Sequence, residues 1–473
     1  MSRFNTLLLV LLCACAGASA WAAPPPNIIL VLIDDMGWGD LSCFGNQEAK
    51  TPHIDRLAAE GLRFRQFYVN APICSPSRCA LMTGQYPQRW KITSFLNNRA
   101  DNERRGMAQW LDPRAPMLPR LLRAQGYATG HFGKWHLGGQ RDVDEAPPLA
   151  DYGLEETLTN FEGMGAKLLP LTRKPGDAGP GRIWEGAERL GGPVVWMPRS
   201  EITRGFVDAA IPFINRAVAA GRPFYVNLWP DDVHSPFWPP VEQWGGGGKK
   251  RLYRAVLEEM DLRLGRLFDH VRDTPALRGN TLILLCSDNG PEAGAGSAGP
   301  WRGAKGMLYE GGIRSPLIAW GPGLIDPVKA GTENDTSVLV AMDLAPTLLA
   351  LAGAEPPEGA SFDGQDMRPV LLGASDARRE PPVFWRRPPD RKYAFRNGPL
   401  PDLAVREGDW KLLCDYDGSR PELYQLASDP GEARNVAAEN PEVTARLIQA
   451  AKTWHESLPP DNDPALGRDA RPQ

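Results

Sequence analysis

Continuous apolar runs that end in acidic or amide residues are the feature that most constrains the fold of this chain. Asn27–Ile33 reads NIILVLI and is followed directly by two aspartates. Runs of this kind are typical of strands buried on both faces of a parallel sheet. Similar runs are PFYVNLW (223–229) and NTLILLCS (280–287). Helix-like segments separate them, which indicates an α/β fold built on one central sheet.

Helical periodicity marks the segments between the strand candidates. We predict helices over 52–62, 117–125, 201–219, 252–273 and 342–352. YATGHFG (127–133) and SPLIAWG (315–321) are further strand candidates. Segment 147–198 has little periodicity, and we expect an irregular insertion near the functional site.

The pattern changes beyond about residue 375. PVFWRR (382–387), LAVREGDWKLLCDY (403–416) and PELYQL (421–426) favour short antiparallel strands, and 441–457 favours a helix. We therefore predict a large domain over 27–375 and a smaller α+β domain over 376–460. The polar segment 461–473 is expected to be a disordered tail.

The N-terminus has the features of a secretory signal peptide. Arg3 precedes an apolar run over residues 7–16, and small residues follow it, so cleavage is expected after Ala20 or Ala23. We assign 1–23 to the signal peptide and predict an exported protein, periplasmic or secreted. LCAC (12–15) resembles a lipobox, so lipoprotein anchoring is the alternative. No later run is long and apolar enough to form a transmembrane segment.

Composition and cysteine usage narrow the function classes. The formal net charge is −4, which does not suggest a nucleic-acid partner. Outside the leader the cysteines are Cys43, Cys74, Cys79, Cys286 and Cys414. Their number is odd and no CxxC pair occurs, so a disulfide framework is not expected and one cysteine is marked as special. We interpret Cys79 as a core residue, with a bridge to Cys43 as the lesser alternative.

Polar residues follow the strand candidates at their carboxyl ends, where open α/β sheets bind ligands. They are Asp34 and Asp35, then Asp231, Asp232 and His234, then Asp288 and Asn289. Carboxylate and amide oxygens suit a hard cation such as Ca²⁺ or Mg²⁺. One aspartate pair alone is more often a solvated turn, but two such groups favour a metal site.

Lysine and histidine residues occur in glycine-rich loops beside these acids. Lys134 and His136 lie in GHFGKWHLGG, and Lys305 lies in RGAKG. Lysines can bind an oxyanion, and His136 and His234 can transfer protons. Each residue alone is unremarkable, but together with hard-cation ligands they predict a phosphoryl- or sulfuryl-transfer site.

Cys74 begins the segment CSPSR (74–78), which precedes an apolar helix-like run. A zinc site lacks partner ligands at the usual spacing. Catalysis by a plain thiol would leave the neighbouring acidic residues unexplained.

The motifs of this chain resemble those of one known family. CSPSR, ALMTGQYP (80–87), LIDDMGWGDLSCFG (32–45), GKWHLG (133–138), SDNG (287–290) and YEGGIRSP (309–316) occur in matching order. They are similar to the type I, formylglycine-dependent sulfatases of the alkaline phosphatase superfamily. The resemblance runs from about 27 to 353 and is nearest to arylsulfatases and N-acetylgalactosamine-6-sulfatase-like carbohydrate sulfatases. It implies an alkaline-phosphatase-like mixed central sheet flanked by helices, with a smaller C-terminal α+β domain.

The resemblance also implies the chemistry. A separate formylglycine-generating enzyme would read CSPSR and oxidise Cys74 to Cα-formylglycine, whose hydrate attacks sulfur. One Ca²⁺ ion would be held by Asp34, Asp35, Cys74 in its modified form, Asp288 and Asn289. Arg78 would steady the hydrate, Lys134 and Lys305 would bind the sulfate, His234 would be the general acid and His136 the base. Lys134, His136, His234 and Lys305 would thus contact the substrate.

The leading hypothesis is an exported sulfatase that acts on a sulfated carbohydrate or an aryl sulfate. The alternatives are a phosphate or phosphonate ester hydrolase of the same superfamily, and an inactive relative that binds sulfated glycans. Sugar contacts are expected from 94–106 and 161–176, which carry basic and aromatic residues. Trp229, Trp238 and Trp301 could stack on a sugar, although core packing is the favoured interpretation of each.

Overall fold

The computed structural model describes residues 24–356, 359–391 and 399–460. The predicted signal peptide 1–23 and tail 461–473 lie outside the described residues. Over the described residues, no helix is both long and apolar enough to cross a membrane.

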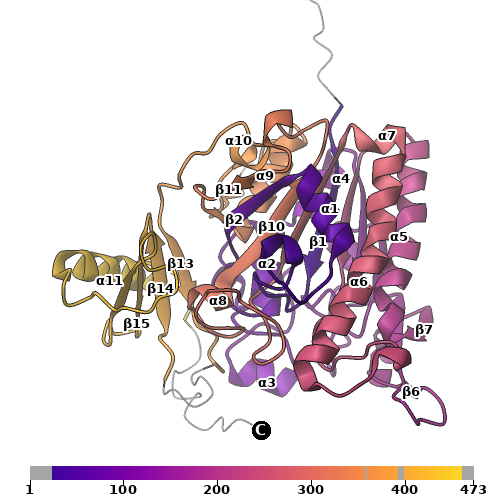
Figure 1. The fold of residues 1–473 in the computed structure, drawn as a ribbon, viewed down its shortest axis with the longest axis horizontal. Coiled ribbons are helices and arrows are strands. Elements are labelled where there is room, and N and C mark those ends of the chain that lie inside the picture. Colours follow the sequence, from indigo (N-terminus) through magenta and orange to yellow (C-terminus); the bar gives the residue numbers. More distant parts are fainter. Residues whose placement is uncertain (1–23, 357–358, 392–398, 461–473) are drawn as a thin grey trace, which may run out of the picture.

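A large mixed sheet forms the centre of the molecule (Figure 1). From one edge to the other its strands are β11 (Glu333–Asn334), β2 (Leu62–Tyr68), β10 (Arg314–Trp320), β9 (Thr281–Ser287), β1 (Asn27–Ile33), β8 (Phe224–Trp229), β3 (Ala128–Gly133), β4 (Glu156–Thr159), β5 (Lys167–Thr172) and β6 (Gly181–Arg182). β12 (Leu339–Val340) pairs with β2, and β7 (Val194–Pro198) pairs with β5. The strands from β9 to β5 run parallel, whereas β10 is antiparallel to both of its neighbours.

Helices cover both faces of this sheet, which explains the continuous apolar run of β1. Ile28, Leu30 and Leu32 enter one core, and the alternate residues Ile29 and Val31 enter the other. The first core lies under α2 (Cys74–Thr83), α4 (Leu118–Ala124) and α9 (Leu344–Leu351). The second lies under α1 (Pro52–Glu60), α5 (Ile202–Ala219), α6 (Gly248–Asp273) and α7 (Pro275–Arg278). Shorter helices are α3 (Arg99–Arg104), α8 (Glu310–Ile313) and α10 (Arg368–Leu371).

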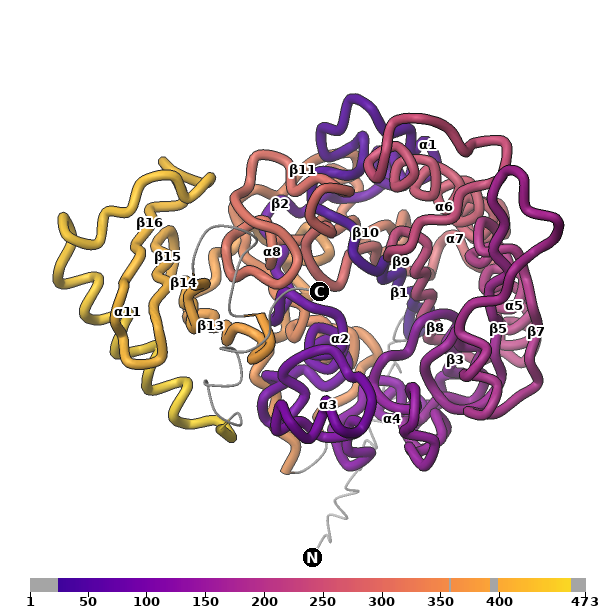
Figure 2. The backbone as a smooth tube through the Cα atoms, turned by 90° about the horizontal axis from the view of Figure 1, so that it is seen from below, coloured from indigo at the N-terminus to yellow at the C-terminus, as the bar shows by residue number. Residues whose placement is uncertain are grey.

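A second, antiparallel sheet lies beside β2 and α8, as Figure 2 shows from below. Its strands are β13 (Val383–Arg386), β14 (Leu403–Glu407), β15 (Trp410–Cys414) and β16 (Glu422–Gln425). The helix α11 (Pro441–Glu456) packs on it around Leu412 and Leu447. The predicted fold class, a mixed α/β sheet flanked by helices with a smaller α+β part, is confirmed.

Two expectations about local structure are wrong. Segment 147–198 is not an irregular insertion, because β4, β5, β6 and β7 extend the central sheet there. These strands are short and lie at an edge, so their sequences lack the long apolar run that marks a central strand. The helix predicted over 52–62 ends at Glu60, and Leu62 starts β2, whose alternating sequence LRFRQFY was missed.

Candidate active site

The carboxyl ends of the neighbouring strands β9, β1, β8 and β3 bring the predicted site residues together. Asp34 follows β1, Lys134 follows β3, His234 follows β8 and Asp288 follows β9. Gly133 ends β3 at φ +134°, and a side chain there would overlap the Trp229 carbonyl of β8. This close approach lets the Lys134 N–H donate to Trp229 O at 2.9 Å, which fixes where the loop leaves the sheet.

Asp34, Asp35 and Asp288 form a fully buried acidic cluster. One carboxylate oxygen from each lies within 4.8 Å of the others. Asp35 has a φ of +61°, a turn conformation that allows the carboxylates of the adjacent residues Asp34 and Asp35 to point into the same cluster. Its N–H donates to Asp288 Oδ1 at 3.1 Å, and Asn289 Nδ2 donates to Asp35 Oδ1 at 2.8 Å.

Three cations face these three carboxylates. Lys134 Nζ lies 2.8 Å from Asp34 Oδ2, and Lys305 Nζ lies 2.6 Å from Asp35 Oδ2. Arg78 Nη2 lies 2.7 Å from Asp288 Oδ2 and 3.2 Å from Asp34 Oδ1. The protein groups therefore balance in charge, and a divalent cation among them would leave the centre with two positive charges.

Burial and neighbouring charges shift the pKa values of the aspartates in this cluster. Burial alone raises the pKa of Asp34, but Lys134, His234 and Arg78 outweigh it and hold that pKa well below the usual value. Burial and the neighbouring Asp34 together raise the pKa of Asp288 well above its usual value. Crowded buried carboxylates of this kind are stabilised by a hard cation.

Two buried oxygen atoms support the same assignment. Within the described part of the chain, Asn289 Oδ1 accepts no hydrogen bond, and Asp34 Oδ1 has the Arg78 guanidinium at 3.2 Å but also accepts no hydrogen bond. Asp34, Asp35, Asp288 and Asn289 thus provide hard oxygen ligands that fit Ca²⁺ or Mg²⁺.

Cys74 is the first residue of α2 and is 2% exposed. Burial opposes the charged form of Lys305, but Asp35 and then Cys74 raise its pKa. For Lys134, Asp34 and then Cys74 act against burial in the same way. Residue 74 therefore lies within electrostatic reach of both lysines, beside the acidic cluster.

The two candidate histidines occupy different environments. His234 is at the mouth of the site, with a side chain 26% exposed and Nε2 3.6 Å from Asp35 Oδ2. His136 is buried at φ +56°, and its Nε2 lies 3.0 Å from the Leu96 carbonyl oxygen and 3.2 Å from Glu162 Oε1. Burial lowers the pKa of His136 to about 3, although Glu162 acts in the opposite direction.

Sequence reasoning missed three residues around this site. Glu162 is 4% exposed and contacts His136. Arg199 Nη1 lies 2.7 Å from Asp231 Oδ1, and Asn160 Nδ2 donates to Asp231 Oδ2 at 2.9 Å. Asn160 and Glu162 follow β4, so the strand-end rule would have found them if β4 had been recognised.

The three tryptophans considered as sugar-stacking residues lie in different environments. Trp229 is fully buried with the Arg78 guanidinium over its ring at 5.1 Å, and Trp301 packs edge-on against Trp38. Trp229 is a packing residue, as favoured, whereas Trp301 packs on Trp38 and also lines a surface pocket, and Trp238 lines another.

The cysteines that the structure describes are free thiols. Cys79 is accordingly a core residue, and no bridge joins it to Cys43.

Comparison with known proteins gives a consistent result. The family model described as Sulfatase matches residues 26–354, and that of the N-sulphoglucosamine sulphohydrolase C-terminal region matches 301–456. N-acetylgalactosamine-6-sulfatase of Sus scrofa is 36% identical over 402 residues, which covers 80% of this chain and 72% of the relative. Arylsulfatase A of Bos taurus is 32% identical over 499 residues and covers 96% of this chain and 90% of the relative.

A solved structure supports the same relationship. The crystal structure of Ps i-CgsB in complex with k-i-k-neocarrahexaose superposes with a TM-score of 0.74 at 28% identity. The match covers 91% of this chain and 92% of that chain.

Proposed function

Because the chain belongs to the sulfatase family, whose members hydrolyse sulfuric esters, we propose that it is an exported enzyme that desulfates a carbohydrate. We further propose that Cys74 is converted to Cα-formylglycine by a formylglycine-generating enzyme and that one Ca²⁺ ion completes the centre. The predicted leader 1–23 supports export. The carbohydrate assignment is supported by the names of N-acetylgalactosamine-6-sulfatase and of the complex with neocarrahexaose.

The charge balance of the site carries this proposal. Asp34, Asp35 and Asp288 are matched by Arg78, Lys134 and Lys305. A bound Ca²⁺ ion would supply the positive charge that attracts a sulfate ester and acidifies a nearby hydroxyl. Its ligands would be the three aspartates, Asn289 and the modified residue 74.

In this proposal the thiol sulfur of Cys74 stands where the hydrate oxygens of formylglycine would be. When formed, the formylglycine hydrate would supply a hydroxyl, already ionised beside Ca²⁺ with its proton released to solvent, as the nucleophile toward sulfur, and the bond from sulfur to the sugar oxygen would break. His234 donates the proton that the departing oxygen takes up, which suits its position at the mouth of the site. Lys134 and Lys305 bind the sulfate oxygens and neutralise their charge.

The second half of the reaction regenerates the residue. His136 would accept the proton of the second hydroxyl, so that the bond from carbon to the sulfate oxygen could break and sulfate could leave as the carbonyl re-forms. Arg78, which donates two hydrogen bonds to Asp288 Oδ2, would steady the hydrate. A serine at position 74 could not complete this step, because its sulfate ester has no second hydroxyl.

Two measurements test the function. Mass spectrometry of the peptide that spans Cys74 should show an aldehyde in place of the thiol in active protein. Turnover of matched sulfate and phosphate esters should favour the sulfate. An intact thiol in fully active enzyme would refute the mechanism, and a strong preference for phosphate would favour the phosphate or phosphonate ester hydrolase. Binding of sulfated glycans without any cleavage would favour the inactive relative.

A further inference from the structure

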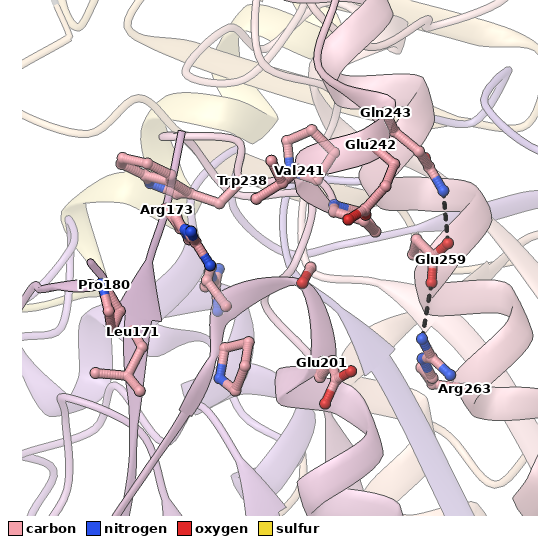
Figure 3. Close-up of a pocket in the computed structure, with 15 residues that line it drawn as sticks. Leu171, Arg173, Pro180, Glu201, Trp238, Val241, Glu242, Gln243, Glu259 and Arg263 are labelled. Atoms are coloured by element: carbon pink, nitrogen blue, oxygen red, sulfur yellow. Dashed lines mark hydrogen bonds and ion pairs between the residues drawn. The ribbon is translucent and has the colours of Figure 1, made fainter. Parts of the chain in front are cut away.

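A surface pocket of about 570 Å³ lies between the β5–β6 hairpin and α6 (Figure 3). In Figure 3, Arg173 and Trp238 lie on one side and Gln243 and Glu259 on the other. The pocket contains none of the residues assigned to the proposed chemistry, so sulfate binding does not explain it.

The pocket is joined to the candidate active site through one buried side chain. Arg199 lines the pocket, and its Nη1 lies 2.7 Å from Asp231 Oδ1. The Asp231 carbonyl accepts a hydrogen bond from the His234 N–H at 3.1 Å. Trp238 follows His234 by four residues, so the two Cα atoms are at most ~14 Å apart. A ligand extended from the sulfate site could therefore reach Trp238.

The chemistry of the lining suits a sugar ring. Trp238 provides an aromatic surface and packs against Trp244 at a centroid distance of 5.7 Å, and Lys174 Nζ lies 5.2 Å from the centre of its ring. Its indole N–H is buried and has no acceptor within the described part of the chain. A pyranose has a C–H face that can pack on such a ring and hydroxyl groups that can accept this N–H and donate to carboxylates.

The charge of the lining indicates which sugar. Its charged residues are Arg173, Arg199, Arg263, Glu201, Glu242 and Glu259. These lining charges balance, and Arg263 and Glu259 form an ion pair at 3.0 Å. Within the described residues, Arg173 and Glu242 make no ion pair and remain available for hydroxyl groups. Lys174, which contacts the Trp238 ring, does not line the pocket, so a second sulfate or a uronate would meet as much negative as positive charge among the lining residues.

We propose that this pocket binds an uncharged pyranose unit linked to the sulfated sugar, an inference that rests on the proposed carbohydrate desulfation. The pocket would hold the part of the substrate that does not react. Its contribution would therefore be binding, equal in the ground state and the transition state, so that it lowers KM and leaves kcat unchanged.

The kinetic test uses three substrates that differ only beyond the sulfate. They are sulfated N-acetylgalactosamine alone, the same unit linked to galactose, and the same unit linked to glucuronate. Trp238→Ala should raise KM about tenfold for the galactose-linked substrate, with little change in kcat and little effect on the monosaccharide. Glu242→Gln, at an exposed position, should act in the same direction.

Trp196→Ala is the matched control, because Trp196 is a partly exposed tryptophan at the same sheet edge outside the pocket. An equal KM for the galactose-linked substrate in wild type and both pocket variants would overturn the proposal, as would an equal KM rise in Trp196→Ala or a wild-type preference for the glucuronate-linked substrate.

A binding measurement separates this inference from the proposed function. Titration calorimetry with the unsulfated galactose-linked disaccharide should give about tenfold weaker binding to Trp238→Ala than to wild type. This result requires no turnover, so it stands even if no sulfate ester is cleaved. Equal affinity of the two proteins would reject the pocket even if the sulfatase activity is found.

Discussion

Glu162 Oε1 lies 3.2 Å from His136 Nε2, and both side chains are almost completely buried. The Leu96 carbonyl oxygen accepts from the same nitrogen at 3.0 Å. Because both partners of Nε2 are acceptors, the neutral ring carries its proton there. Nδ1 has no partner among the described residues, so it is the nitrogen available to accept a proton.

Glu162→Gln should therefore alter the proposed base without touching the substrate. The carboxylate raises the pKa of His136 against the effect of burial, so its loss should move the acid limb of the kcat profile to lower pH. We expect kcat to fall about tenfold or more with KM nearly unchanged. Glu439→Gln, on the surface, is the control. An unshifted pH profile would show that Glu162 does not influence the proton transfer by His136.

Substitution of His234 should show dependence on the leaving group. A general acid matters most when the departing oxygen is a poor leaving group. His234→Ala should lower kcat by about 10²–10⁴-fold for a sugar sulfate and much less for nitrophenyl sulfate. Equal losses on the two substrates would argue against the acid role.

The metal assignment predicts a calcium-dependent stability. Added Ca²⁺ should raise the melting temperature of the wild-type protein. At a concentration one hundred times the dissociation constant, the free energy of unfolding should increase by about 2.7 kcal/mol. Asp35→Asn should reduce both the calcium content and this shift. Asp376→Asn, at an exposed acid, should leave both unchanged. Retention of stoichiometric calcium by Asp35→Asn would remove Asp35 from the ligand set.

Lys411 of β15 connects the small sheet to α8. Its Nζ lies 3.0 Å from Glu310 Oε1 and 2.8 Å from Glu432 Oε1, and all three side chains are fully buried. Lys411→Met should leave two carboxylates without their shared cation and lower the free energy of unfolding by about 3–5 kcal/mol. Lys329→Met, which breaks the exposed pair with Asp376, should cost at most about 1 kcal/mol in chemical denaturation. Similar losses for the two variants would show that the buried ion pairs of Lys411 contribute no more than an exposed pair.

His131 should contribute to acid sensitivity. Its ring lies edge-on to Trp135 and Trp229, and burial lowers its pKa to about 3. In the unfolded chain the pKa is about 6.5, so the unfolded state binds more protons between these values. Above pH 6.5 this histidine does not lower the free energy of unfolding. Below pH 6.5 the free energy of unfolding falls as the pH decreases, by up to about 1.4 kcal/mol per pH unit for this group.

His131→Phe keeps an aromatic ring at that position and removes the titrating nitrogens. Between pH 7 and pH 5 the variant should therefore lose less unfolding free energy than the wild type in urea titrations. Parallel pH profiles of the two proteins would show that His131 does not titrate on unfolding.

Local signals explain why the principal candidates could be predicted from the sequence. The apolar run of β1 and the aspartates directly after it are adjacent in the chain, and strand direction brings Asp34 and Asp288 to the same edge of the sheet. Motif order then identified Cys74, Lys134 and Lys305 as candidates without any knowledge of packing. For the same reason, the fold class was readable from the alternation of strands and helices.

Only the tertiary structure decided which of these groups touch and which further residues join them. Glu310 and Lys411 are 101 residues apart and meet through the packing of two sheets. Glu162 reaches His136 because the short strand β4 pairs with β3, and Trp238 lines a pocket through a turn between β8 and α6. Backbone periodicity is a local property of the chain, whereas such pairings depend on how distant elements pack against each other.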